Sequence, residues 1–280
     1  MFVDRIRLVG KILVSGLLFS TLGVGGILLS LMVVPFMRLA PGGTGARQRR
    51  GRWMIHVFFK AFVWALQGSG ILLLDVDGLP DPKALEGKLL LANHPGYLDV
   101  VLIISLLGKA ACVVKEPVYD SFFFGGVVRA AGHVPNRDPE SVIAAGAEAL
   151  RQGNALIVFP EGTRTAPGSP LKFQRGAAHI ALRSQAPIVP LIVTCNPPLL
   201  EKGAKWYDVP MRTCRYRVSI QAPLDLDLPG IEQLPPHLAA RLLTRELEHH
   251  FNKEVHESGN HSAGDQAIHH RDPGAGGYSA

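Results

Sequence analysis

A histidine and an aspartate lie five residues apart beside an apolar run. Leu89 to Ala92 is followed by Asn93, His94, a Pro-Gly pair and then Asp99, which opens the next apolar run. A carboxylate across a short turn can accept the imidazole Nδ1 proton, which leaves Nε2 free as a general base. The chain contains no Gly-x-Ser-x-Gly segment. We therefore expect His94, held by Asp99, to act directly on a substrate hydroxyl; a structural turn histidine is the alternative.

A second polar cluster follows another apolar run. Ala155 to Phe159 leads into Pro160, Glu161, Gly162, Thr163 and Arg164. A loop of this composition offers backbone N–H groups, a hydroxyl and a planar guanidinium, which together suit a phosphate group. The pattern also fits a solvated loop with a structural Glu-Arg pair.

Two further cations stand near the ends of predicted elements. Lys115 closes the run that begins at Ala110, and Arg137 ends the segment that starts at Gly132. Ligand sites collect at strand ends in α/β proteins, so both cations are candidates for binding an anionic substrate.

Short apolar or β-branched runs alternate with helical patterns from Gly70 onward. Asp138 and Pro139 are typical of a helix start, and Gly153 is typical of the residue after a helix. The runs that predict strands are Ile71 to Val76, Leu89 to Ala92, Ala110 to Val114, Ala155 to Phe159, Ile188 to Thr194 and Arg215 to Gln221. This alternation predicts an α/β domain with a mostly buried sheet.

The N-terminal part is apolar and basic. Residues 12–37 contain no charged side chain, and as a helix they would measure about 39 Å, against about 30 Å for a bilayer core. The run is too long for a cleaved signal peptide. Stronger positive charge after the run predicts that the C-terminal body lies in the cytoplasm, although an in-plane hairpin also fits. Residues 53–67 predict an interfacial helix; a core helix of the following domain is the alternative.

Composition supports a membrane partner and argues against nucleic acid. Of 280 residues, 47% are hydrophobic and 19% are charged. The net charge of +6 is concentrated in the first 52 residues, which leaves a nearly neutral body without the basic face that nucleic acid requires. Three cysteines without metal-ligand spacing predict neither a disulfide framework nor a metal site. Histidines recur in residues 257–280, but the lack of periodicity predicts a disordered, solvated tail there.

The order and spacing of four blocks resemble bacterial 1-acylglycerol-3-phosphate O-acyltransferases, which belong to the glycerolipid acyltransferases. The resemblance covers roughly residues 50–225, and the blocks are residues 93–99, 132–137, 159–164 and 186–190. It implies a single α/β acyltransferase domain with a mixed sheet flanked by helices, over residues 68–256. Residues 1–67 would be the membrane-anchoring helices that precede this domain.

The resemblance also implies roles for individual residues. His94 would be the base on the acceptor hydroxyl, and Asp99 would orient it. The acceptor phosphate would be held by Arg137, Gly162, Thr163 and Arg164, with Glu161 in the same substrate-binding block. Lys115 would contact the phosphate or the oxyanion.

The implied reaction transfers a fatty acyl group from an acyl thioester to a lysophosphatidate-like acceptor in phospholipid biosynthesis. The donor would be acyl-acyl carrier protein or acyl-coenzyme A, with no cofactor or metal. The expected location is a bacterial inner membrane, with the domain on its cytoplasmic side. Differences in residues 132–137 and 194–210 leave another acceptor open: a lysophospholipid, an acylated amino acid or a pathway-specific lipid. A non-catalytic membrane-anchored binding protein is the remote alternative.

Overall fold

The strand-forming runs assemble into one mixed seven-stranded sheet in the order β1-β7-β6-β2-β5-β3-β4. The computed structural model describes residues 2–35, 41–166, 168–201, 203–226 and 228–268. Strands β2 to β6 are parallel to one another, β7 is antiparallel to β6, and β1 is parallel to β7. The strands are β1 (Leu72–Asp77), β2 (Leu89–Ala92), β3 (Ala111–Lys115), β4 (Val134–Asn136), β5 (Leu156–Val158), β6 (Ile188–Asn196) and β7 (Cys214–Ile220).

Each of the six predicted strands is present, with ends that differ by no more than two residues. The seventh, β4, was not predicted because it has three residues and one of them is Pro135. Proline lacks the N–H that a central strand needs, and β4 indeed lies at the edge of the sheet. Because the carboxyl ends of β2, β5, β3 and β4 share one edge, the segments that follow these strands lie near one another.

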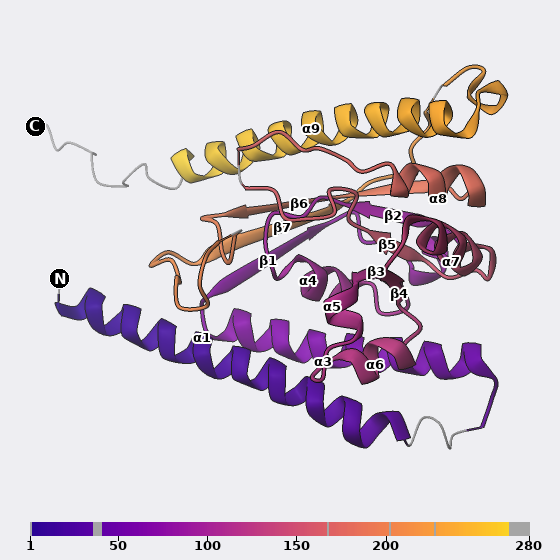
Figure 1. Cartoon of the computed structure of the whole chain (residues 1–280). Coiled ribbons are helices and arrows are strands. Elements are labelled where there is room, and N and C mark those ends of the chain that lie inside the picture. Colours follow the sequence, from indigo (N-terminus) through magenta and orange to yellow (C-terminus); the bar gives the residue numbers. More distant parts are fainter. Residues whose placement is uncertain (1, 36–40, 167, 202, 227, 269–280) are drawn as a thin grey trace, which may run out of the picture.

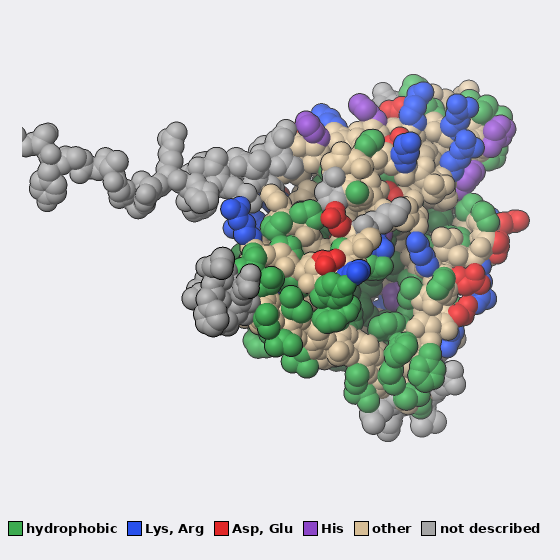
Figure 2. Space-filling view, turned by 60° about the vertical axis from the view of Figure 1, so that its left-hand side comes forward, with side chains coloured by type: hydrophobic (Ala, Val, Ile, Leu, Met, Phe, Trp, Pro, Cys, Tyr) green, Lys and Arg blue, Asp and Glu red, His purple; other side chains and the backbone are tan. Residues whose placement is uncertain are grey.

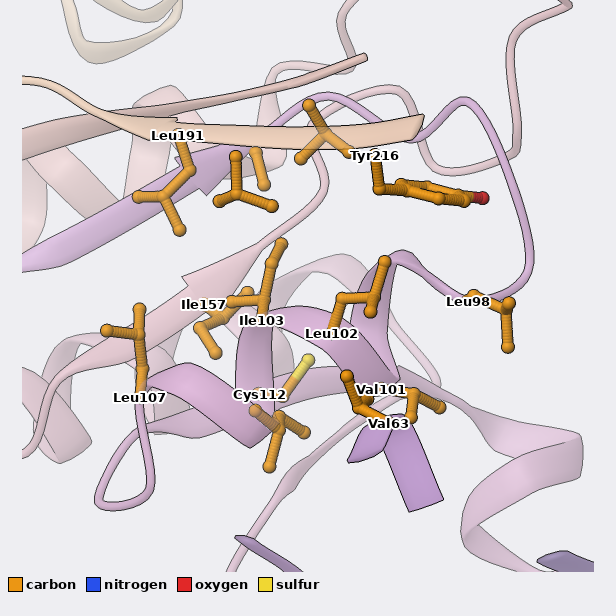
Figure 3. Close-up of a cluster of buried hydrophobic side chains, with 14 of the residues drawn as sticks. Val63, Leu98, Val101, Leu102, Ile103, Leu107, Cys112, Ile157, Leu191 and Tyr216 are labelled. Carbon is orange, nitrogen blue, oxygen red and sulfur yellow. The ribbon is translucent and has the colours of Figure 1, made fainter. Parts of the chain in front are cut away.

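Helices cover both faces of the sheet (Figure 1). One face packs against α7 (Pro139–Arg151), α8 (Gly176–Ser184) and α9 (Pro236–Ile268), and the other against α3 (Thr44–Gly68), α4 (Asp99–Leu106) and α6 (Gly125–Ala130). Successive side chains of β2 alternate between these cores: Leu89 and Leu91 join one, and Leu90 the other. In Figure 3, Leu102 and Ile103 point from α4 toward the sheet, and Leu191 points back from it.

The predicted helix after Asp138 is confirmed as α7. The Asp138 side chain accepts a hydrogen bond of 2.9 Å from the backbone N–H of Ser141 and caps the helix. Pro139 is the first helical residue, where its missing N–H costs nothing. The helix ends at Arg151, two residues before Gly153.

The predicted interfacial helix at 53–67 is part of a longer helix that belongs to the core. Helix α3 begins at Thr44, nine residues earlier than predicted, and buries four hydrophobic side chains in the core: Ile55, Phe62, Val63 and Leu66. Trp53 and Trp64 lie on its exposed side. The domain boundary predicted at residue 67 therefore falls between α3 and the domain whose core α3 helps to form. Sequence periodicity could not tell which neighbour would cover this face.

The N-terminal apolar run forms α1 (Phe2–Leu28), which continues through a π-helical turn at Leu29–Val33. Among the described residues, one stretch, Leu8–Leu31, is long and apolar enough to cross a bilayer. Residues 36 and 37 of the predicted run lie outside the described residues. Helix α1 lies against the body of the protein, below α3 in Figure 1.

The predicted disordered tail is helical in its first half. Helix α9 continues to Ile268, whereas disorder was expected from residue 257; residues 269–280 lie outside the described residues. The chain contains no proline between Pro236 and Pro273. The backbone hydrogen bonds of the helix can therefore continue past residue 257, although the sequence there has no hydrophobic periodicity.

Candidate active site

His94 and Asp99 form a hydrogen-bonded pair beyond the carboxyl end of β2. His94 Nδ1 lies 2.7 Å from Asp99 Oδ2, and the backbone N–H of Gly96 donates to the same oxygen at 2.8 Å. The Asp99 side chain is fully buried, while 18% of the His94 side chain is exposed. The buried Asp99 carboxylate thus fixes the orientation of the His94 ring, and part of the ring remains accessible to solvent.

Burial raises the pKa of Asp99, and the hydrogen bond from His94 acts in the opposite direction. Among the described residues, the second carboxylate oxygen, Oδ1, has no hydrogen-bond partner. An anionic Asp99 therefore depends on His94 and on the Gly96 N–H. This dependence favours the tautomer in which Nδ1 carries the proton and Nε2 is free to accept one.

The turn between the two residues leaves no room for a side chain at Gly96. A Cβ there would lie 2.7 Å from the Tyr216 hydroxyl oxygen and 3.0 Å from the Leu199 carbonyl oxygen. Tyr216 is fully buried and donates to Leu199 at 3.3 Å. Close packing against Tyr216 of β7 and the Leu199 carbonyl therefore requires glycine at position 96.

Asn93 fixes the end of β2 to β6. Its side-chain amide donates to the Val193 carbonyl at 2.8 Å and accepts from the Val193 N–H at 2.7 Å. This two-way bond replaces a backbone pair at the point where β2 ends. It sets the direction in which the chain enters His94.

Glu161 joins the two polar segments that the sequence analysis singled out. Its Oε1 accepts from the His94 backbone N–H at 2.6 Å, and its Oε2 accepts from the Thr165 hydroxyl. The Thr165 N–H in turn donates to the His94 carbonyl at 3.1 Å. Glu161 is buried and both of its carboxylate oxygens accept hydrogen bonds within the protein, so it connects the two segments and is not open to substrate. Burial raises its pKa.

Arg164 is held beside the pair by an aromatic ring and a carbonyl. Its guanidinium carbon lies 3.3 Å from the centre of the Tyr97 ring, and Nη1 donates to the Glu201 carbonyl at 3.3 Å. The positive charge opposes the rise in the pKa of Asp99, which places Arg164 within electrostatic reach of the pair. The remaining N–H groups of this planar fork can bind an anion.

Gly162 and Thr163 are exposed at the tip of the same loop. Gly162 has φ of +68°, which favours glycine, and its N–H donates to the Phe159 carbonyl at 3.1 Å. Phe159 packs its ring 4.5 Å from the His94 ring. The structure thus brings His94, Asp99 and the loop from Phe159 to Arg164 together, as predicted.

Lys115 and Arg137 lie farther along the same edge. Lys115 is the last residue of β3, and Arg137 follows β4. At about 4.8 Å per strand, β4 is about 14 Å from β2. Arg137 contacts Asp120 at 2.9 Å and Glu116 at 3.2 Å, which raises its pKa. Lys115 is exposed and has no ion pair among the described residues. Arg137 would have to leave its carboxylates to reach a phosphate bound by Arg164.

Sequence reasoning did not single out Tyr97, Thr165, Tyr216 or the Glu201 carbonyl. Tyr97 lies within the His94 to Asp99 block, and its position three residues after the predicted base could have marked it as part of the site. The other contacts join segments tens of residues apart, and no pattern in the chain marks them.

Two of the three cysteines, Cys112 and Cys214, are buried, and the Cys195 thiol donates to the Pro197 carbonyl at 3.2 Å. A hydrogen bond with Cys195 lowers the pKa of Cys214. Burial raises the pKa of Cys112 to about 12, and the backbone N–H of Cys112 donates to His133 Nδ1 at 3.0 Å. Among the described residues, no group of three or more His, Cys, Asp or Glu side chains could hold a metal ion.

Comparison with known proteins finds similarity to acyltransferases. Residues 75–194 match the family model described as Acyltransferase. A 1-acyl-sn-glycerol-3-phosphate acyltransferase of Cocos nucifera is 28% identical over 205 residues, covering 69% of this chain and 63% of the relative. The 1-acyl-sn-glycerol-3-phosphate acyltransferase alpha of Mus musculus is 38% identical over 152 residues, covering 52% and 53%. The chain thus spans less than two thirds of the length of these relatives.

A solved structure shares the fold. The crystal structure of the 1-acyl-sn-glycerophosphate acyltransferase PlsC from Thermotoga maritima has a TM-score of 0.67 and 20% sequence identity, and the match covers 91% of this chain and 98% of that one. The family match spans both His94 and Arg164. Residues 75–194 of this chain are thus similar to the Acyltransferase family model, and the chain shares the fold of a solved acyltransferase structure.

Proposed function

We propose that this protein transfers a fatty acyl group from an acyl thioester to the free hydroxyl of a lysophosphatidate-like acceptor. The observation that carries the proposal is the buried Asp99 carboxylate, 2.7 Å from His94 Nδ1, beside a guanidinium with free N–H groups. The named activity of the relatives supports the same substrate class.

The geometry of the pair supports the following reaction. His94 Nε2 takes the proton of the acceptor hydroxyl while its oxygen attacks the thioester carbonyl carbon, and Asp99 stabilises the imidazolium that forms. The tetrahedral oxyanion then collapses, the C–S bond breaks, and the imidazolium returns its proton to the leaving thiolate. Arg164 holds the acceptor phosphate, so that the hydroxyl stays near Nε2. Lys115 is the candidate for the oxyanion.

The test measures product and thiol release with the purified full chain. Acyl-coenzyme A and acyl-acyl carrier protein are each supplied with lysophosphatidate, with monoacylglycerol lacking the phosphate, and with lysophosphatidylcholine. We expect phosphatidate as the preferred product with at least one donor, and transfer reduced by at least about 100-fold in the His94→Ala variant. Preference for the phosphate-free or the choline acceptor would replace the lysophosphatidate assignment, and thiol release without any acylated lipid would contradict acyl transfer to lipid.

We propose further that α1 attaches the protein to the membrane in the plane of the bilayer surface, with the domain on the cytoplasmic side. Polar contacts tie α1 and the π-helical turn that follows it to the body. Lys11 Nζ donates to the Met211 carbonyl at 3.1 Å, and Ser30 Oγ in the π-helical turn donates to the Phe123 carbonyl at 3.3 Å. A helix held along its length in this way leaves only its outer side for lipid.

That outer side is apolar. Five of its side chains are exposed and recur at helical spacing: Leu13, Leu17, Val24, Leu28 and Leu31. Figure 2 shows hydrophobic side chains gathered on the lower part of the molecule and charged ones on the upper part. This distribution supports a membrane-facing side formed by α1 and its neighbours.

The attachment is tested without removing α3, which supplies core residues. A variant with Leu13→Glu, Leu17→Glu and Leu28→Glu should appear in the soluble fraction, whereas the parent should resist high salt. A matched variant with Leu73→Glu, Leu79→Glu and Leu238→Glu changes exposed leucines elsewhere and should stay bound. Cysteines introduced by Asp4→Cys and Thr44→Cys should react with an impermeant thiol reagent from the same side; reaction from opposite sides would show that α1 spans.

A further inference from the structure

An open basic cavity lies at the N-terminal half of α3. Its volume is about 440 Å³, and four of its five lining residues are basic or aromatic: Arg49, Arg50, Trp53 and Lys109, with Ala46 as the fifth. Lys109 comes from the loop that joins α4 to β3. Two segments sixty residues apart therefore place three cations around one opening.

No acidic side chain in the described part of the chain pairs with these cations. Among the described residues, neither Arg49, Arg50 nor Lys109 takes part in an ion pair. Arg50 donates to the Pro41 carbonyl through Nη2 at 2.5 Å, while its Nη1 is buried without a described hydrogen-bond partner. Arg49 and Lys109 are exposed at the cavity without an acidic partner among the described residues, and this unpaired positive charge favours an anion there.

A fourth cation increases the positive potential behind the cavity. Arg52 is buried and donates to the Ala131 carbonyl at 3.0 Å and to Asn154 Oδ1 at 2.7 Å, both of them uncharged. Burial lowers the pKa of Arg52, and the charge of Arg49 adds to this effect. The repulsion between these charges is relieved when an anion binds among them.

The cavity is remote from the candidate active site. Lys109 precedes β3 and His94 follows β2, and these strands run parallel. The two residues therefore lie at opposite edges of the sheet, separated by the length of α4, about 12 Å, and the turns at its ends. An anion bound in the cavity is not in contact with the reacting groups.

We propose that this cavity binds the phosphate of an anionic phospholipid headgroup. Two arginine forks and an ammonium suit a phosphodiester, and Trp53, 61% exposed, provides an aromatic side chain of the kind found at membrane interfaces. The cavity lies near the beginning of α3, the helix alongside α1, so a lipid at the membrane-facing side can reach it. The proposal rests on the membrane attachment proposed above and does not depend on acyl transfer.

The test uses the full chain in uncharged detergent micelles, with Trp53 as reporter. Trp64→Phe and Trp206→Phe leave Trp53 as the remaining tryptophan, and His94→Ala prevents turnover. The protein is titrated with phosphatidylglycerol, with phosphatidylcholine, and with inorganic phosphate at matched ionic strength. We expect saturable binding of phosphatidylglycerol, and at least 10-fold weaker binding of the other two.

Two triple variants separate a built site from general charge. Arg49→Gln, Arg50→Gln and Lys109→Gln should weaken phosphatidylglycerol binding about 10- to 100-fold. Lys172→Gln, Arg183→Gln and Arg241→Gln remove the same charge from exposed positions and should change it less than 2-fold. Arg49→Lys with Arg50→Lys keeps the charge but removes the planar forks, and should still weaken binding several-fold.

Three results would overturn the proposal. Equal binding of phosphatidylcholine would show that the headgroup charge is not recognised. Equal losses in both triple variants would indicate only net charge. Binding of inorganic phosphate as tightly as phosphatidylglycerol would indicate a site for a soluble anion. The three titrations measure binding in a protein that does not turn over. Their outcome is therefore independent of whether the unmodified protein transfers acyl groups.

Discussion

The two edges of the parallel strands hold their charged side chains in opposite ways. At the carboxyl edge, Asp99 and Glu161 are buried, and each accepts two hydrogen bonds from neighbouring segments. At the amino edge, Arg49 and Lys109 are exposed and have no acidic partner among the described residues. The first edge is therefore preorganised by its hydrogen bonds, whereas the second is left open, as the proposed reaction and the proposed lipid site require.

The largest expected effect is at the preorganised edge. His94→Ala should reduce kcat by about 10²- to 10⁴-fold, the usual contribution of a general base. The imidazole is partly exposed, so the variant should fold; circular dichroism and thermal unfolding check this. A folded variant with near-normal kcat would contradict the comparison, because the edge would then be only structural.

Arg164→Lys should have the next largest effect. The lysine keeps the charge but loses the fork and the stack on Tyr97, so kcat/KM for the phosphorylated acceptor should fall about 10- to 150-fold. The donor KM should change little. With an acceptor that lacks the phosphate, parent and variant should be nearly equal; an equal loss with that acceptor would assign Arg164 to structure or to the donor.

Tyr97 tests whether the stack itself matters. Tyr97→Leu should raise the acceptor KM about 2- to 30-fold, since a cation–π contact contributes about 0.5–2 kcal/mol. Tyr97→Phe retains the ring face and should restore the parent value. If the phenylalanine variant is as poor as the leucine variant, the hydroxyl and not the ring face is responsible.

Glu161 gives the smallest effect, on stability and its pH dependence. Its pKa is raised by burial above the ordinary 4.5, so the folded state binds more protons than the unfolded state between these two values. Its contribution to stability is therefore lost as the pH rises from about 4.5. Denaturant unfolding at several pH values gives the slope of the unfolding free energy against pH. Glu161→Gln should make this slope less negative above about pH 4.5; an unchanged slope would mean that folding does not raise the pKa of Glu161.

Much of this fold could be predicted from the chain because strands and capped helices leave local patterns. Six runs of the sheet and the start of α7 at Pro139 were predicted within two residues. The short strand β4 was missed because a pattern of three residues with a proline is too brief to recognise. The early start of α3 was missed because residues 44–52 are polar and basic, and only tertiary packing buries Arg52.

The sequence by itself determined the chemistry that is available: His94, Asp99 and Arg164 stand in segments of fixed type and spacing, and hydrogen-bonding capacity belongs to the residue. Only the tertiary structure decided how these groups are used. It buried Asp99 under His94, turned Glu161 into a brace between two loops, and engaged Arg137 with Asp120. The burial of a side chain and its hydrogen-bond partners depend on which segments meet in the fold, and adjacent residues in the sequence do not reveal this.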